Sequence, residues 1–409
     1  PRDIAENPTI IGHEFSGEVV EVGAKWKDQF KPGDKFSIQP AMNYAGGPVG
    51  IYSAPGYSYP NIGGDATYVV IPNEVMACGC LLPFTGRGFY PASLSEPLSC
   101  VIGAMHANYH TTPGSYVHSM EIKDGGKMAL LASVGPMGLA AINYVLHRED
   151  RKPSLLVVTD INQERLDRAA SLYTVEFAAS RGIALKYVNT GATDDPVGLL
   201  KEIAGGDGYN DVFCFAPVAP VVEQADDILA YDGCLNFFAG PTDQKLSAMF
   251  HFYNIHYMNH HIVANSGGDV KDMADSVDWI GKGYLHPEVM ITHVGGLDSA
   301  ASATFDMLKI PGGKRLVYTH VNMPMTAISD FAEKGRSSPF FAELDRICSA
   351  NNGLWCKAAE DYLLAHAGDA ALAVKPCVHY CLPAAPADRL DLFNGVRHGH
   401  KPMAAFKKL

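Results

Sequence analysis

The run Gly12-His13-Glu14, near the start of the chain, places an imidazole directly beside a carboxylate. Both groups are ligands that zinc accepts in proteins, and a catalytic zinc commonly has three protein ligands and one open position. The pair therefore predicts part of a metal site. Because these two side chains do not complete such a site, at least one further ligand must come from another part of the sequence.

A second chemical signal lies in the stretch KMALLASVGPMGLAAINYVL, which joins a buried strand to a helix. Glycines at the turn, Gly135 and Gly138, let the backbone approach a pyrophosphate. Pro136 suits the first turn of a helix, whose N–H groups and positive dipole end then point at the phosphates. We therefore expect Gly135, Pro136, Met137 and Gly138 to bind a dinucleotide, although Ser133 stands where the usual motif has its first glycine.

An acidic residue follows at the spacing that this motif requires. The strand Leu155–Thr159 ends in Asp160, twenty-two residues after Gly138. A carboxylate there accepts hydrogen bonds from the ribose hydroxyls of NAD and repels the 2′-phosphate of NADP. Arg165 is close enough in the sequence to weaken this discrimination. We expect NAD in preference to NADP; the alternative is an ordinary strand–helix turn followed by a surface aspartate.

Two kinds of sequence pattern surround these residues. The first part of the chain has short β-rich runs separated by turns rich in Gly and Pro, which is typical of a small irregular β domain. These runs are Phe15–Val22, Lys35–Gln39 and Ala66–Ile71. From about residue 125 apolar strands alternate with helical stretches, and this predicts an α/β domain with a doubly wound parallel sheet. The expected strands are Lys127–Ala132, Leu155–Thr159, Leu185–Val188, Asp211–Phe215, Cys234–Phe238 and His261–Ala264.

Composition excludes several classes of protein. With 409 residues, 47% of them hydrophobic, the chain is long enough for two domains with buried cores. Its net charge of −12 argues against a protein that binds nucleic acid. No apolar run approaches the roughly 20 residues that a membrane span requires. Nine cysteines without a disulfide pattern fit a reducing compartment, so we expect a cytoplasmic protein.

Four segments resemble one enzyme family, in that family's order. The pattern G-H-E-x-x-G-x-x-x-x-x-G at Gly12–Gly23, SEPLSC at Ser95–Cys100, SVGPMG at Ser133–Gly138 and the run Ile291–Leu308 are similar to the zinc-dependent medium-chain alcohol and polyol dehydrogenases. Within that family, the segments CVIGA, YPNIGGDATYVVIPNEVM, CLNFFAGP and GGKRLVYT resemble the sorbose-1-phosphate reductases.

The resemblance implies a domain plan. It gives a GroES-like catalytic domain over residues 1–110, a Rossmann domain that binds NAD over residues 111–268, and a return to the catalytic domain over residues 269–330. Residues 331–409 are a C-terminal extension of unknown role, and PAAPADRL within them suggests a loosely ordered tail. The implied coenzyme site also includes Val134, Ala216 and Gly240.

The resemblance further implies one catalytic zinc. His13 supplies an imidazole, and Glu14 or Glu96 supplies a carboxylate, since family members differ in this choice. The family's remaining ligand is a cysteine some tens of residues before the GHE motif, and only twelve residues precede His13. We therefore expect an N-terminal segment to be missing from this chain. The four cysteines of the family's structural zinc are absent from residues 34–77, so we expect no second zinc there.

The motifs and the resemblance imply a zinc- and NAD-dependent oxidoreductase that interconverts a ketose and the corresponding polyol. The resemblance alone implies that the ketose is a ketose phosphate, such as sorbose 1-phosphate. Zinc polarises a carbonyl oxygen, and the nicotinamide exchanges a hydride with the same carbon. The implied assembly is a homo-oligomer, a dimer or a tetramer. Two alternatives stay open: a dehydrogenase of unphosphorylated polyols, and a nucleotide-binding relative that has lost its zinc.

Other groups of metal-binding residue types are weaker candidates. The segment HFYNIHYMNHH carries His251, His256, His260 and His261, for which we expect polar and packing roles. Cys78 and Cys80 are too closely spaced to form a metal clip by themselves. Cys377, His379 and Cys381 form at most half a site.

Overall fold

The computed structural model describes residues 7–60, 62–307, 309 and 312–367. They fall into two compact units. The first unit contains the described parts of Pro1–Glu96, Asp269–Lys282 and Ile291–Leu409, and the second contains Pro97–Gly268 and Gly283–Met290. The expected first boundary is residue 110, whereas the N-terminal segment of the first unit ends at Glu96. The reason is that most of the helix that contains Glu96 belongs to the second unit and packs on its sheet, where Asn236 Nδ2 donates to Ala104 O over 3.1 Å.

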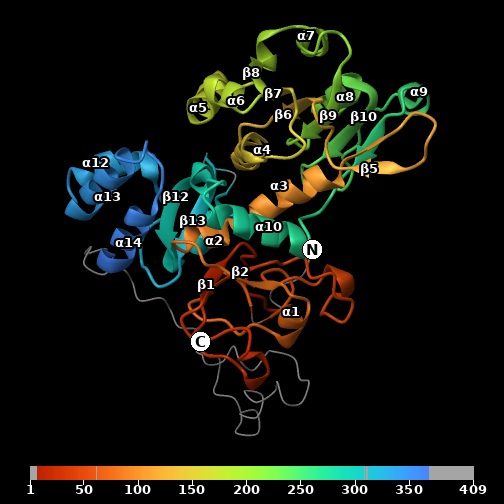
Figure 1. The fold of residues 1–409 in the computed structure, drawn as a ribbon. Helices are drawn as coiled ribbons and strands as arrows, with labels where there is room; N and C mark the ends of the chain where they lie inside the picture. Colours follow the sequence, from red (N-terminus) through yellow and green to blue (C-terminus); the bar gives the residue numbers. More distant parts are fainter. Residues whose placement is uncertain (1–6, 61, 308, 310–311, 368–409) are drawn as a thin grey trace. The chain divides into compact units, whose positions relative to one another are not determined.

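The second unit is built around a six-stranded parallel sheet with the order β11-β10-β9-β6-β7-β8 (Figure 1). Its elements are α3 (Ser95–Ala107, whose first two residues belong to the first unit), β4 (Tyr109–Thr111), β5 (His118–Met120), β6 (Lys127–Leu131), α4 (Pro136–His147), β7 (Leu155–Asp160), α5 (Gln163–Leu172), α6 (Val175–Ser180), β8 (Ala184–Asn189), η3 (Thr190–Ala192), α7 (Pro196–Ile203), β9 (Tyr209–Cys214), α8 (Ala219–Asp227), β10 (Leu229–Phe237), α9 (Phe252–Tyr257), β11 (His261–Val263) and η4 (Pro287–Met290). The predicted doubly wound sheet is confirmed.

Apolar strands and capped helices explain this arrangement. In β6 the four residues Met128–Leu131 are fully buried, as expected of a strand covered on both faces. Asn162 begins α5 by accepting the N–H of Arg165, and Asp195 begins α7 by accepting the N–H of Gly198. The strand order reverses at β6, which pairs with β7 on one side and β9 on the other. Ligands of such folds bind at the carboxyl ends of the strands beside this point.

A buried polar network fixes the hairpin β4–β5 to strand β10. The ring of His110 bonds Asp211 Oδ1 through Nε2 over 3.1 Å and the carbonyl of Asp232 through Nδ1 over 2.9 Å. The Asp232 carboxylate accepts the N–H of Thr111 and lies 2.9 Å from Nε2 of His261. The network satisfies polar groups that burial would otherwise leave without partners.

The first unit holds two small sheets. The antiparallel sheet β1-β2-β3 comes from the N-terminal part of the chain, and the sheet β13-β12-β14 comes from its C-terminal part. The elements are β1 (Ser16–Glu18), η1 (Ala24–Trp26), β2 (Lys35–Ile38), η2 (Gly50–Tyr52), α1 (Asn73–Ala77), β3 (Leu81–Pro83), α2 (Tyr90–Ser93), α10 (Val270–Gly281), β12 (Ile291–Gly296), η5 (Leu297–Ser299), α11 (Ala300–Phe305), β13 (Lys314–Tyr318), β14 (Thr326–Ala327), η6 (Ile328–Asp330), α12 (Phe331–Gly335), α13 (Pro339–Ser349) and α14 (Lys357–His366).

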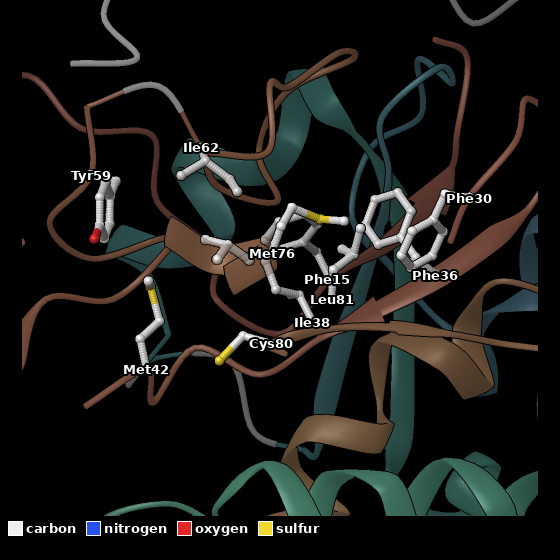
Figure 2. Close-up of a cluster of buried hydrophobic side chains, with 11 residues drawn as sticks. Phe15, Phe30, Phe36, Ile38, Met42, Tyr59, Ile62, Met76, Cys80 and Leu81 are labelled. Atoms are coloured by element: carbon white, nitrogen blue, oxygen red, sulfur yellow. The ribbon is translucent and has the colours of Figure 1, made fainter. Parts of the chain in front are cut away.

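A hydrophobic core fills the N-terminal sheet of this unit. Figure 2 shows its side chains, which include Phe15, Phe36 and Leu81 from the sheet region and Met76 from α1. Phe15 and Phe36 meet edge to face, with ring centroids 6.2 Å apart. Phe15 directly follows Glu14 in the sequence, so burial of the phenylalanine anchors the backbone that carries the predicted metal ligands.

The expected strand Ala66–Ile71 is wrong, since none of these six residues lies in a strand. Val69 and Ile71 are only partly buried and pack their side chains against the core without joining a ladder. Alternation of apolar and polar residues therefore reflects packing on one face here, not strand pairing.

The described part of the C-terminal extension is helical. Its described residues, 331–367, form the three helices α12, α13 and α14 within the first unit. The indole of Trp355, which is fully buried, donates to Tyr318 Oη of β13 over 2.9 Å. PAAPADRL lies outside the described residues. Within the described part of the chain, no helix is both long and apolar enough to cross a membrane.

Candidate functional site

The three predicted metal ligands come together in the first unit. One ligand atom each from His13, Glu14 and Glu96 lies within 4.8 Å of the other two. His13 and Glu14 stand just before β1, and Glu96 is in the first turn of α3, where it is 5% exposed. His13 Nε2 lies 3.8 Å from Glu14 Oε1. An imidazole and two carboxylates at these separations can share one divalent cation.

Close backbone packing fixes the loop that carries His13. The N–H of Gly64 donates to the carbonyl of Gly12 over 2.7 Å, and the N–H of Asp65 donates to the carbonyl of Ile11 over 3.0 Å. A Cβ atom on Gly56 would lie 2.4 Å from the carbonyl oxygen of Gly12, so only glycine fits there. The Gly- and Tyr-rich segment, which stands where the family has the cysteines of its structural zinc, thus supports the loop that carries the predicted metal ligand His13.

Tyr57, from the same segment, contacts the predicted imidazole ligand. Its ring stacks on that of His13 with centroids 4.3 Å apart, and its Oη lies 3.2 Å from His13 Nε2. Burial lowers the pKa of His13; Glu14 opposes this shift and Lys314 adds to it. The lowered pKa keeps the imidazole neutral near pH 7, which is the form that binds a metal.

Lys314 adds a positive charge beside the predicted metal ligands. It is the first residue of β13, and its Nζ forms an ion pair with Oε1 of Glu14. The two side chains are about a quarter exposed, at 23% and 24%. Of the two carboxylates, Glu14 is therefore partly neutralised by a lysine, while Glu96 is the more deeply buried.

The donor set passes a simple chemical test for zinc. It contains one neutral nitrogen donor and two carboxylates, which is a combination that zinc accepts, and the backbone of each ligand segment is held by protein contacts. The structure therefore brings together His13, Glu14 and Glu96 as the sequence predicts.

In the second unit, the predicted phosphate-binding turn lies between β6 and α4. Gly135 is the N-cap of α4, with no side-chain cap on the first N–H groups, and Pro136 is the first helical residue. A Cβ atom on Gly135 would meet no atom within 4 Å among the described residues, whereas a Cβ on Gly138 would lie 1.8 Å from Ser133 O. Gly135 thus borders open space in front of the helix, and Gly138 permits close packing of turn and helix.

The other predicted coenzyme residues lie at the same edge of the sheet. Asp160 is the last residue of β7, Ala216 follows β9 and Gly240 follows β10. Oδ1 of Asp160 accepts the N–H groups of Ile161 and Asn162 over 2.9 and 3.0 Å, which orients the carboxylate. Val134 is buried at the turn, and Arg165 is exposed in the first turn of α5. The uncapped helix and the oriented carboxylate fit a nicotinamide dinucleotide.

The histidine-rich segment does not gather its own side chains around one point. His251 instead joins Asp226 and Asp227 in the other potential metal group among the described residues, and its Nδ1 lies 3.0 Å from Asp226 Oδ2. His261 bonds Asp232, and the ring of His256 meets Tyr257 edge to face. His260 is buried, and its Nδ1 lies 3.6 Å from Asp226 Oδ1.

The cysteine candidates add little. Cys80 is buried and its thiol lies near the carbonyl of Cys78. Neither potential metal group in the described part of the chain includes a cysteine. Cys377, His379 and Cys381 lie outside the described residues.

Sequence reasoning missed Tyr57 and Lys314. The composition of the segment around Tyr57 could have indicated a role at the site, because this segment is rich in Gly, Pro and Tyr and lacks the family's cysteines. Lys314 lies 300 residues from Glu14 in the sequence, and no local pattern joins them.

Parts of this chain match known protein families. Residues 2–79 match the family described as an alcohol dehydrogenase GroES-like domain, and residues 136–282 match the zinc-binding dehydrogenases. The chain is 52% identical to mannitol-1-phosphate 5-dehydrogenase of Aliivibrio fischeri over 89% of this chain and 85% of the relative. It is 43% identical to L-sorbose 1-phosphate reductase of Klebsiella pneumoniae over 90% of this chain and 85% of the relative.

Solved structures support the fold. The crystal structure of 2R,3R-butanediol dehydrogenase from Bacillus subtilis superimposes with a TM-score of 0.58 and 22% identity, covering 76% of this chain and 80% of the other. The expected combination of a Rossmann sheet with a GroES-like domain is confirmed. The chain belongs to the zinc-binding medium-chain dehydrogenases, and it is an oxidoreductase that acts on CH–OH groups.

Proposed function

We propose that this protein interconverts a polyol phosphate and the corresponding ketose phosphate, with one zinc held by His13, Glu14 and Glu96 and with NAD(H) as coenzyme. The observation that carries the proposal is the convergence of these three side chains within 4.8 Å in one compact unit. The phosphate in the substrate is supported by the names of the two relatives, which act on mannitol 1-phosphate and sorbose 1-phosphate.

The chain's own residues prepare the metal site. When bound, zinc would polarise the carbonyl oxygen of the ketose or stabilise the alkoxide of the polyol. His13 would be neutral because of its lowered pKa, and the stacked ring of Tyr57 would restrict its rotation. Lys314 would hold one oxygen of Glu14 and limit the net negative charge beside the substrate.

The coenzyme would bind at the carboxyl ends of β6 and β7. The first N–H groups of α4 would face the pyrophosphate across Gly135, since no side chain caps them. Asp160 would accept hydrogen bonds from the ribose hydroxyls through the carboxylate that Ile161 and Asn162 orient. This arrangement favours NAD over NADP, because a 2′-phosphate would lie next to a negative charge.

An assay with four substrates tests the proposal. Mannitol 1-phosphate with NAD and sorbose 1-phosphate with NADH are compared with unphosphorylated mannitol and sorbose in the zinc-loaded protein. We expect one of the phosphate esters to have a kcat/KM at least about tenfold higher than its unphosphorylated parent, because a charged group that the site recognises contributes more than about 1.4 kcal/mol. Equal values for the ester and the free sugar would favour the unphosphorylated polyol dehydrogenase.

Removal of the metal tests the remaining alternative, a nucleotide-binding relative that has lost its zinc. Removal of zinc with a chelator should abolish turnover, and added zinc should restore it, while NADH still binds to the stripped protein. Turnover that persists after stripping, and in the variant His13→Ala, would contradict the metal site. The clustering of three donors speaks against a relative that has lost its zinc.

A further inference from the structure

A buried carboxylate in the C-terminal helices makes contacts that the metal chemistry does not use directly. Glu360 of α14 is fully buried. Its Oε1 and Oε2 accept the N–H of Phe89 over 3.0 and 2.9 Å, and Oε1 also accepts the N–H of Tyr90 over 2.9 Å. The hydroxyl of Tyr318 donates to Oε1 over 3.0 Å. Since a buried charge is costly without partners, these bonds fix the carboxylate in one place.

The contact requires a close approach that only glycine allows. Gly88, with φ +91°, directly precedes the two N–H donors, and a Cβ atom there would lie 2.6 Å from Glu360 Oε2. A side chain at residue 88 would therefore displace the carboxylate as well as strain the backbone. Glycine at residue 88 thus leaves room for the carboxylate of Glu360, although 272 residues of sequence separate the two.

Phe89 and Tyr90, whose N–H groups donate to Glu360, stand at the start of the segment that leads to Glu96. Phe89 and Tyr90 begin α2, which ends at Ser93, and α3 begins at Ser95 with Glu96 in its first turn. The ligand is thus six residues beyond the second of these N–H groups. Because only six residues separate Tyr90 from Glu96, a displacement of α2 would also move Glu96.

Hydroxyl groups fix the rest of this segment. Ser37 Oγ donates to Ala92 O over 2.5 Å, and Ser95 Oγ donates to Pro91 O over 3.0 Å. Ser276 Oγ of α10 donates to Ser95 O over 2.8 Å. The backbone on both sides of the turn between α2 and α3 is therefore bonded to other elements, and Glu360 supplies the anionic partner at its start.

We propose that Glu360 is a positioning residue for the metal site, because by fixing the position of α2 it fixes that of Glu96. The C-terminal helices α12–α14 would then contribute to metal binding through Glu360. The inference rests on the proposed role of Glu96 as a zinc ligand. Metal ligands must lie within about 0.2 Å of their ideal distances, and loss of a group that orients a ligand commonly weakens metal binding about 10- to 100-fold.

The test uses the full-length protein and two variants. Glu360→Gln keeps the size of the side chain but points an amide N–H₂ group at N–H donors, and Gly88→Ala pushes against an unaltered Glu360. Zinc affinity is measured by competition with a chelator, and NADH affinity by fluorescence titration. We expect both variants to bind zinc about 10- to 100-fold more weakly. NADH affinity should be unchanged, and excess zinc should restore kcat.

Two control variants make the outcome specific. Phe341→Leu removes ring contacts with Phe331 and Phe340 within the same helices, and it should lower the melting temperature without changing zinc affinity. Glu96→Ala tests the proposed ligand itself and should lose zinc. Unchanged zinc affinity in Glu360→Gln and Gly88→Ala, together with loss of zinc in Glu96→Ala, would overturn the positioning role alone.

Two further results would also count against the inference. Weakening of zinc by Phe341→Leu to the same extent would show that general destabilisation is the cause, which overturns the positioning role. Zinc retained by Glu96→Ala would contradict the proposed metal site and the inference with it. If Glu360→Gln fails to fold, Gly88→Ala carries the test, because it keeps the carboxylate and its charge.

Discussion

Lys314 and Glu14 form an ion pair that joins the first residue of β13 to the GHE motif. The pair places a cation beside the metal site and holds one oxygen of a predicted ligand. The ammonium group of Lys314 repels a divalent ion, and its ion pair with Glu14 competes with coordination of a metal by that carboxylate. Lys314 should therefore weaken metal binding. The zinc affinity of the protein is thus expected to be lower than the three donors alone would give.

The variant Lys314→Met tests this relationship. We expect it to bind zinc about tenfold more tightly, because it removes a positive charge and releases Glu14; the estimate is modest because both side chains are partly exposed to solvent. Competition with a chelator measures the change. Lys314→Arg keeps the charge and is the control, with little change expected. Weaker zinc binding in Lys314→Met would mean that the lysine supports the site.

The two glycines of the coenzyme turn should respond differently to alanine. Gly135→Ala adds a Cβ that meets no described atom within 4 Å, so the melting temperature should be unchanged while NADH binds more weakly. Gly138→Ala places a Cβ 1.8 Å from Ser133 O and should destabilise the second unit by about 1–3 kcal/mol. Thermal unfolding and fluorescence titration give the two values. Full NADH affinity in Gly135→Ala would contradict the proposed position of the pyrophosphate.

Coenzyme preference depends on Asp160 in this account. NADH should bind more tightly than NADPH, and Asp160→Ala should narrow the difference by about tenfold or more, since a charge-assisted hydrogen bond is worth roughly 1.5–3 kcal/mol. Both coenzymes are titrated by fluorescence. Asp167→Ala, on the following helix, controls for the loss of one surface charge. Equal affinities in the unmodified protein would refute the assignment.

The pH dependence of stability should report the buried network of His110. Burial by itself would lower the pKa of His110, but the hydrogen bond and charge of Asp211, together with Asp232, outweigh it and raise the pKa. A histidine with a raised folded-state pKa contributes stability that is fully present below its unfolded pKa of about 6.5 and is lost as the pH rises through the folded value.

The variant His110→Gln should therefore lose roughly 3 kcal/mol of unfolding free energy at about pH 6, because it breaks a buried charge pair there. The loss should be smaller at about pH 9, where the histidine is neutral. Urea unfolding at both pH values measures the difference. His256→Gln, in the exposed helix α9, controls for the loss of one imidazole. A loss that grows with pH would show that His110 is held neutral in the folded protein.

Local signals explain what could be predicted from the sequence. The proposed coenzyme site lies on strand, turn, helix and strand in direct succession, so spacing along the sequence is enough to predict β6, the turn at Gly138 and a carboxylate at the end of β7. His13 and Glu14 are adjacent, and resemblance to the family added Glu96. Buried strands of the parallel sheet are continuous apolar runs, which composition reveals without a structure.

Contacts between distant residues explain what could not be predicted. The pairing of Lys314 with Glu14 has no local pattern, and neither has that of Glu360 with Phe89. A glutamate in a helix ordinarily faces solvent, so a fully buried one cannot be distinguished by periodicity. No local pattern assigns a role to the C-terminal extension either, and the structure shows that Trp355 and Glu360 pack into the first unit.

The zinc content of the purified protein shows whether His13, Glu14 and Glu96 hold a metal ion. Elemental analysis should find one zinc per chain in the unmodified protein and in His251→Ala, and none in His13→Ala, because the imidazole of His13 is the nitrogen ligand of the only site that we propose. Zinc retained by His13→Ala would contradict the account. A second zinc that disappears in His251→Ala would do so as well, because it would show that Asp226, Asp227 and His251 hold a metal.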